Sequence, residues 1–404
     1  MNDAPSGRPV ERRRAFEVFR VALVLGVTAF GGPIAHVGYF EHAYVRRRRW
    51  LTEAEFAELL ALCQAIPGPA SSQLGFLIGL HRAGYWGALA AWLGFTLPSA
   101  VILFAAAGAA ARLNGPYLAA VIHGLEWVAV AVVAQAVWAM ARRLWSDAAT
   151  AAIGVAAGGL ALFGVAPQAP LLTLGVGAVF GAVVCRAPAA SGPPGASVVG
   201  RRVALTAGAA LVALLLGLPL LAARDPHGSI ALADVFFRAG ALVFGGGHVV
   251  LPLLHGPLVS AGWLSEDAFL AGYGIAQAVP GPLFTVAAYF GAGNLYVDPP
   301  LWGAAVAVIA IFLPGLLLAL AAAALWKTVA AHAWCRRALM GVNAAVVGLL
   351  AAALWNPIVT TSVHSLADGL AACAAVLLLQ RFRVPPPLVA LLCVATSLTM
   401  RVWR

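Results

Sequence analysis

Two helix-breaking motifs each occur twice in this chain, in the same order and inside apolar stretches. Residues 30–33 (FGGP) are matched by 244–247 (FGGG), and residues 64–69 (QAIPGP) are matched by 277–282 (QAVPGP). The first pair is offset by 214 positions and the second by 213, so the register slips by only one residue between them. Chance rarely holds register over such a length, and the chain is therefore a duplicated module.

The composition places these breaks in a lipid environment. Of 404 residues, 62% are hydrophobic and 10% are charged, whereas soluble domains carry about 25% charged residues. A bilayer crossing takes about 20 apolar residues. The stretches that reach or approach this length are 84–110, 117–141, 148–163, 168–185, 203–222, 301–326, 338–355 and 366–380. The sequence predicts an all-α polytopic membrane protein that is embedded in a lipid bilayer.

The net charge of +10 comes from basic residues in short loops beside the apolar stretches, where the positive-inside rule places them. Aromatic and basic residues do not interleave as on a nucleic-acid-binding surface, so we expect no nucleic acid partner. The five cysteines are scattered without a C-x-x-C pair. We therefore predict neither a disulfide framework nor a metal site, and we expect no cofactor.

A segment rich in Pro, Gly, Ala and Ser separates the two halves, as expected of a linker. The predicted division of the chain is a first transmembrane repeat (1–185), a cytoplasmic linker (186–202), a connecting transmembrane helix (203–223) and a second, inverted transmembrane repeat (224–404). The arginines at 12–14 precede an apolar run with no convincing cleavage site, so we expect the amino terminus to be retained.

The basic residues also predict an orientation. The basic loops of the first half lie at 12–14, 46–49, 82, 142–143 and 186–202. All can be cytoplasmic only if 15–45 and 52–80 each enter and leave by the same face. The second-half counterpart of the four-arginine loop, 260–263, has no basic residue, as expected outside the cell. Two inverted-topology repeats, with broken or re-entrant helices that meet near the bilayer midplane, fit this pattern. Arg401 and Arg404 do not fit it.

Interrupted helices in a bilayer require a reason, because lipid cannot satisfy the freed backbone groups. A helix that restarts at a Gly-Gly or Pro-Gly-Pro break points unpaired N–H groups and the positive end of its dipole at the break. Four such starts, two from each half, would attract a compact anion. The carbonyl ends of the preceding half-helices could equally hold a cation, so the breaks alone do not fix the sign of the ligand.

Arg238 favours an anion. It precedes Phe244 by six residues, and its repeat counterpart is the apolar Val24. An arginine so far into an apolar arm is costly and usually functional, and its planar fork suits a tetrahedral oxyanion. The alternatives are a side chain that snorkels to the interface and an ion pair with Asp234, four residues earlier.

Histidine, glutamine and hydroxyl side chains beside the breaks complete the candidate site. The histidines are ligand donors, protonation sites or packing residues, and the glutamines donate to substrate or to a neighbouring carbonyl. The hydroxyl side chains either cap a helix start or face the substrate. The candidate substrate-binding residues are Gly31, Gly32, His36, Gln64, Gly68, Ser71, Arg238, Gly245, Gly246, Gly247, His248, Gln277, Gly281 and Thr285.

Acidic residues within the apolar stretches are few. Glu126 is the clearest, three residues after His123, and the pair either relays a proton or lies at the membrane surface beside Trp127. The sequence has no G-x-x-x-x-G-K-[ST], no H-E-x-x-H and no Ser/His/Asp constellation. It therefore gives no support to an ATPase or an intramembrane protease, and we expect no enzymatic activity.

The paired motifs at 30–33, 64–69, 244–247 and 277–282 resemble the chromate ion transporter (CHR) superfamily in its long two-domain form. The resemblance covers nearly the whole chain outside the linker and the two ends. It implies a secondary transporter that exports chromate across the bacterial inner membrane and gives chromate resistance, with sulfate as a related ligand. The alternatives are a carrier of sulfate or another oxyanion and a channel for small anions. A two-repeat monomer is already a complete unit, and a homodimer is compatible with it.

Overall fold

The computed structural model describes residues 8–112, 116–163, 169–186, 199–244 and 247–402, and every regular element in these ranges is helical. The first repeat contains α1 (Arg8–Thr28), α2 (Gly32–Phe40), the π-helix η1 (Glu41–Arg47), α3 (Glu53–Ala65), α4 (Ala70–Arg112), α5 (Pro116–Leu144), α6 (Ala148–Phe163) and α7 (Ala169–Val184). The connecting helix is α8 (Arg201–Ala222). The second repeat contains α9 (Ser229–Leu242), η2 (Gly247–Val249), α10 (Val250–His255), η3 (Gly256–Ser260), α11 (Glu266–Ala278), η4 (Leu283–Thr285), α12 (Val286–Gly293), α13 (Pro300–Ala331), α14 (Ala333–Ala353), η5 (Leu354–Val359), α15 (Thr360–Ser362), α16 (Leu366–Gln380) and α17 (Pro386–Val402).

Within the described ranges, five helical segments are long and apolar enough to cross a membrane. They are Ala70–Ala110, Ala119–Leu144, Arg201–Ala222, Pro300–Ala324 and Ala333–Ser362. Three other predicted crossings form helices of 16, 16 and 15 residues, namely α6, α7 and α16. At 1.5 Å per residue these span roughly 22–24 Å, which is less than the hydrocarbon core of about 30 Å.

The outer surface suits lipid rather than water. On α8, Leu216 is 65% exposed and Leu220 is 73% exposed, and the helix has few buried positions. Such a large apolar surface would favour aggregation in water, whereas acyl chains cover it without cost. The predicted fold class, an all-α polytopic membrane protein, is confirmed by this architecture.

Helices end at the breaks that the motifs predict. α1 ends at Thr28 and α3 at Ala65 in the first repeat, and α9 ends at Leu242 and α11 at Ala278 in the second. α3 and α11 also begin alike, with a polar cap in each. Thr52 forms a capping box with Glu55, and Ser265 accepts from the N–H of Ala268, so each helix start is stabilised by its own side chains.

α4 folds back on itself at Ala83 and Gly84, whose backbone angles are not helical. The two arms come so close that a side chain on Gly79 would collide with the carbonyl of Gly87. The second repeat has the same fold-back between α12 and α13, which are separate helices there. Small residues at these crossings allow the two backbones of each pair to touch.

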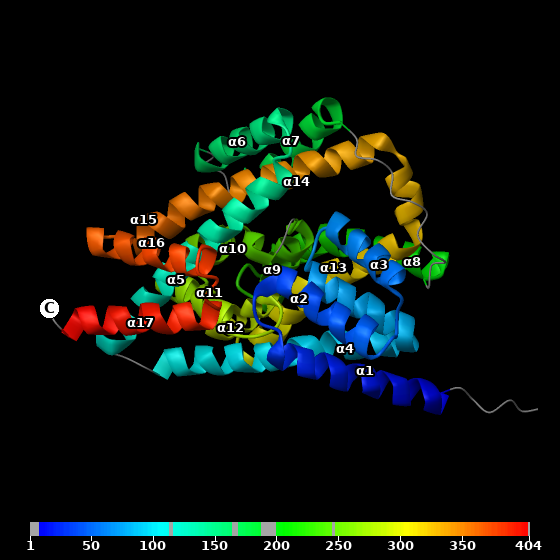
Figure 1. The fold of residues 1–404 in the computed structure, drawn as a ribbon, viewed down its shortest axis with the longest axis horizontal. Coiled ribbons are helices and arrows are strands. Elements are labelled where there is room, and N and C mark those ends of the chain that lie inside the picture. The colour runs from blue at the N-terminus through cyan, green and yellow to red at the C-terminus, as the bar shows by residue number, and fades with distance from the viewer. Residues whose placement is uncertain (1–7, 113–115, 164–168, 187–198, 245–246, 403–404) are drawn as a thin grey trace, which may run out of the picture.

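The terminal helix pairs are exchanged between the repeats. α6 and α7 of the first repeat pack on α14 of the second, and α16 and α17 of the second repeat pack on α5 of the first, as Figure 1 shows. Glycines make the first of these contacts possible: Gly177 and Gly181 of α7 face Gly341, and Gly158 of α6 faces Gly348. Both α6 and α7 thus use a Gly-x-x-x-Gly spacing to approach α14 closely.

Candidate functional site

The four breaks meet in crossed pairs at the interface of the repeats. The N–H of Gly68, in the second break of the first repeat, donates to the carbonyl of Val243 at 2.7 Å. In the equivalent place, the N–H of Gly281 donates to the carbonyl of Ala29 at 3.0 Å. Each repeat therefore satisfies backbone groups that the breaks of the other repeat leave free, as an apolar environment demands.

Glycine is required at both crossings. Gly68 has a φ of +118° and Gly281 a φ of +102°, a region that other residues rarely adopt. A Cβ on Gly281 would lie 2.8 Å from Ser99 Oγ, and one on Gly68 would lie 3.0 Å from the Cα of Gly315. Ser99 and Gly315 are themselves equivalent, since each follows a repeated Leu-Pro pair. Each Pro-Gly-Pro turn is thus wedged against a proline-containing helix of the other repeat.

His36 links the first break to the start of α4. Its ring is buried, with Nε2 3.2 Å from the carbonyl oxygen of Ala29 and Nδ1 3.3 Å from Ser71 Oγ. Because a carbonyl only accepts, Nε2 carries a hydrogen, and a neutral ring then accepts from the Ser71 hydroxyl. His36 and Ser71 therefore lie together at the crossing, and both already have protein partners.

The first turn of α4 presents donors that no described residue accepts. The earliest intrahelical bond runs from the N–H of Gln73 to the carbonyl of Pro69 at 2.9 Å, so the N–H groups of Ala70, Ser71 and Ser72 precede it. The buried hydroxyl of Ser72 also has no hydrogen-bond partner among the described residues. Unpaired N–H groups and a hydroxyl at a helix start are the donors that an anion needs.

Gln73 belongs to the crossing although the motifs did not identify it. Its buried Nε2 donates to the carbonyls of Pro67, at 2.8 Å, and Gly315, at 3.0 Å. Its Oε1 has no partner among the described residues. The repeat counterpart is the apolar Val286. A glutamine inside an apolar helix was the available signal, but it lies outside the repeated motifs that guided the prediction.

The two equivalent glutamines lie in different surroundings. Gln64 is exposed, and its Oε1 accepts from Arg143 at 2.7 Å. Gln277 is half-buried, its Nε2 is enclosed, and its side chain hydrogen-bonds with the buried Tyr273 on the same helix. Thr285 donates its hydroxyl to the carbonyl of Pro282 at 2.6 Å. It therefore binds a carbonyl of its own turn and does not cap an N–H group of α12, which the sequence offered as the alternative to facing the substrate.

Arg238 forms a two-pronged ion pair with Asp234 one turn earlier on α9. Nε lies 2.8 Å from one carboxylate oxygen and Nη2 lies 2.7 Å from the other. The arginine side chain is 39% exposed and that of the aspartate 11%. The ion pair that the i, i+4 spacing offered as the alternative is therefore present, and Arg238 lies one turn before α9 ends at Leu242.

The second Phe-Gly-Gly motif is described only in part. Gly245 and Gly246 lie outside the described residues, and the side chain of His248 does as well. Gly247 begins η2, where a Cβ would lie 3.3 Å from Cβ of Leu283 at the start of η4. In the first repeat, Gly31 and Gly32 have positive φ angles. Gly31 precedes α2 and Gly32 is its first residue, and this helix has no side-chain cap.

A helical bundle in which the breaks of two repeats cross is the architecture of a membrane transporter. The chain belongs to the chromate transporter family, whose model matches residues 16–182 and again residues 230–398. The two matched segments lie one in each of the predicted repeats.

Relatives with assigned names cover most of the chain. A probable chromate transport protein of Synechococcus elongatus is 32% identical over 345 residues, which are 82% of this chain and 81% of that protein. The chromate transport protein of Cupriavidus metallidurans is 28% identical over 382 residues, covering 89% of this chain and 86% of the relative. That of Pseudomonas aeruginosa is 28% identical over 339 residues, covering 83% and 79%. No solved structure gives a significant match.

Proposed function

We propose that this chain is a secondary transporter that exports chromate, a tetrahedral dianion, across the bacterial inner membrane and so gives chromate resistance. The observation that carries the proposal is the crossing of the breaks between the repeats, next to unpaired donors at the start of α4. Chromate transport proteins among the relatives supply the substrate class.

The anion binds at the first turn of α4 in this proposal. Three backbone N–H groups and the Ser72 hydroxyl point there, and the amide of Gln277, which also hydrogen-bonds with Tyr273, has a second N–H to donate. Arg238 supplies positive charge from α9 when the anion displaces Asp234 from its guanidinium. The N–H groups of Gly68 and Gly281 already donate across the repeats, so these glycines shape the site rather than bind the ligand. His36 positions Ser71.

Transport requires that this site open. Ser71, Ser72 and His36 are buried, so an anion cannot reach the first turn of α4 while the breaks remain packed. Rocking of one repeat against the other would separate the crossed pairs and admit the anion from one face at a time. The two cross-repeat hydrogen bonds are the contacts that this motion must break and remake.

The membrane potential favours the proposed direction. Outward movement of a dianion across an inside-negative membrane gains roughly 4.6 kcal/mol per 100 mV. Export can then proceed without a coupling ion, whereas uptake of the same dianion needs one. Sulfate has the same charge and shape as chromate and is expected to compete for the site.

Reconstituted vesicles loaded with chromate test the proposal. Efflux should saturate with chromate concentration, accelerate when a potassium diffusion potential makes the interior negative, and show counterflow with external chromate. Flux that never saturates and lacks counterflow would identify a small-anion channel. Saturable sulfate flux without chromate flux would identify a sulfate carrier. Cells that express the chain should accumulate less chromate than control cells, and greater accumulation would contradict export.

A further inference from the structure

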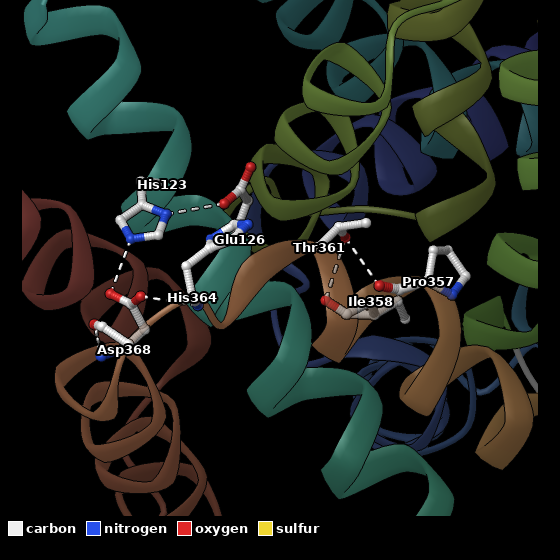
Figure 2. A network of polar contacts seen from close by, with 8 residues as sticks. His123, Glu126, Pro357, Ile358, Thr361, His364 and Asp368 are labelled. Carbon is white, nitrogen blue, oxygen red and sulfur yellow. Dashed lines mark hydrogen bonds and ion pairs between the residues drawn. The ribbon is translucent and has the colours of Figure 1, made fainter.

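Three ionisable side chains form a network between the repeats, away from the crossing of the breaks. Figure 2 shows His123 of α5 between Glu126 on the same helix and Asp368 near the start of α16. His123 Nδ1 lies 3.0 Å from Glu126 Oε2, and His123 Nε2 lies 3.0 Å from Asp368 Oδ1. Glu126 is 6% exposed and Asp368 is 7% exposed. Two carboxylates are thus enclosed around one imidazole.

The two contacts of His123 fix the number of protons in the network. Each of the two nitrogen–oxygen contacts needs a hydrogen between its atoms, because a bare nitrogen lone pair and a carboxylate oxygen repel. A neutral imidazole has one N–H and an ionised carboxylate has none. Both contacts form only if the ring is an imidazolium or one carboxyl is protonated. The closed network therefore holds one proton more than a neutral histidine with two carboxylates.

The proton in the network affects how the start of α16 is held, because Asp368 also binds the turn there. Asp368 Oδ2 accepts from the backbone N–H of His364 at 3.0 Å, and the N–H of Asp368 donates to Ser365 Oγ at 3.2 Å. The carboxylate that receives His123 therefore also organises the turn at which α16 begins. If the extra proton leaves, one hydrogen remains for the two contacts, so the contact to Asp368 that joins α5 to this turn competes for it with the contact to Glu126 within α5.

Few other charges reach this place from the elements packed on α5. Between 386 and 400, α17 has no charged residue, and η5 and α15 have none. Two titratable side chains lie nearby in the described part of the chain: His364, whose ring lies 6.2 Å from that of His123, and Cys393, on α17 where that helix approaches Gly124. The indole of Trp127 covers the His123 ring edge-on at 4.9 Å.

α11 holds its charges at a distance from the network. It meets α5 where Gly274 approaches Leu125, two turns beyond Glu266 and Asp267 at its start. Glu266 is moreover paired with His255, at 2.8 Å. These carboxylates therefore do not take part in the proton count.

α14 likewise brings no charge to His123. Arg336 and Arg337 lie near its start. Further along this helix, Ala344 accepts from Trp145 Nε1, just beyond the end of α5 that is remote from His123. The network is thus isolated from the arginines of both repeats.

We propose that His123, Glu126 and Asp368 form a proton-binding site, in which the bound proton holds α5 to the start of α16, and that this proton is coupled to anion transport. The coupling rests on the proposed transport function, whereas the proton-binding site does not. The His123 side chain is 32% exposed, so the network is not sealed inside the protein. Because α5 and α16 belong to different repeats, the proton acts on a contact that rocking of the repeats would strain.

Hydrogen exchange on the purified protein tests proton binding without any transport. Exchange at 363–370, corrected for the intrinsic rate, should accelerate by at most about tenfold per pH unit as the pH rises through the pKa of the network and the proton leaves. His123→Gln retains one donor but cannot gain the proton, so its corrected exchange should be flat with pH. Glu126→Gln should lose much of the dependence as well. His42→Gln, at an exposed histidine, should behave like the wild-type protein. An unchanged pH dependence in both network variants would overturn the site.

Vesicle flux then tests the coupling. Chromate flux of the wild-type protein should vary with the pH on the side of the vesicle membrane that the His123 network faces. His123→Gln should transport at a rate that no longer depends on that pH. The chromate flux of His123→Gln could keep the wild-type dependence on pH while its hydrogen exchange at 363–370 is flat with pH. That result would show that the proton is bound but not coupled to transport, and the proposed coupling would be wrong. If the wild-type protein moves no chromate at all, the transport proposal fails, while the exchange result still decides the proton site.

Discussion

Arg238 is held by both oxygens of Asp234, and a dianion that enters the site competes with that carboxylate for the guanidinium. This competition distinguishes an Arg238 that binds the anion from an Arg238 that only anchors α9. A charge-assisted hydrogen bond contributes about 1.5–3 kcal/mol. If Arg238 binds the anion, Arg238→Gln should weaken chromate binding by roughly 10- to 150-fold. Asp234→Asn should retain or strengthen binding, because it removes the competing negative charge. Calorimetric titration of the purified variants measures both effects.

A purely structural role of the Arg238–Asp234 pair predicts a different result. If the pair only anchors α9, both substitutions break the same ion pair and both should lower the thermal stability, with little change in affinity per folded molecule. Size-exclusion profiles before each titration provide the control for folding. Equal affinities for the two variants would remove Arg238 from the binding site.

At the residue level, the repeated motifs predicted the backbone better than the side chains. Positive φ angles occur at Gly31, Gly68 and Gly281, which the Gly-Gly and Pro-Gly-Pro patterns indicate because only glycine adopts them readily. The motifs could not predict that Gln64 is exposed while Gln277 is enclosed. Those surroundings are set by partners from other helices, as with Gln73 and the carbonyl of Gly315, and no local pattern encodes them.

At the level of elements, the breaks fall where the apolar pattern and the breaker residues together place them. The fold-back of α4 at 83–84 also lies where the predicted hairpin 52–80 gives way to the predicted crossing 84–110. The lengths of α6, α7 and α16 were harder to predict, because an apolar run shows where lipid or core is tolerated and not where a helix ends. Whether the two repeats are inverted is a question of orientation, on which the arginine distribution bears.

Cysteine labelling at equivalent positions tests that orientation. Arg48 follows η1 and Ala261 follows η3, 213 positions later. If the repeats are inverted, a membrane-impermeant maleimide should label Ala261→Cys on intact cells and Arg48→Cys only after the membrane is opened. The exposed Cys373 should first be replaced by serine. Labelling of both positions from the same side would show parallel repeats.

At the scale of the whole molecule, the repeats interlock in a way that the linear division of the chain does not suggest. A predicted boundary at 186–202 separates two segments in sequence. In the structure, however, α6 and α7 of the first repeat pack on α14 of the second, whereas α16 and α17 of the second repeat pack on α5 of the first. Short helices of this kind bury their small-residue faces only when the partner repeat is present. The choice of partner is tertiary, and a hydrophobic pattern that is equally compatible with packing inside one repeat cannot reveal it.

Interlocking predicts how the chain behaves when it is divided in the linker. Fragments 1–199 and 200–404, expressed separately, should be unstable, because each then exposes the glycine faces of its terminal helices and lacks the cross-repeat hydrogen bonds at Gly68 and Gly281. Co-expressed, they should assemble, so that an affinity tag on one fragment recovers the other in equal amounts. The intact chain with the same tag is the matched control. Two fragments that are each stable and monodisperse alone would show that the repeats fold as independent units, and the exchange of helix pairs would then contribute little to the stability of the protein.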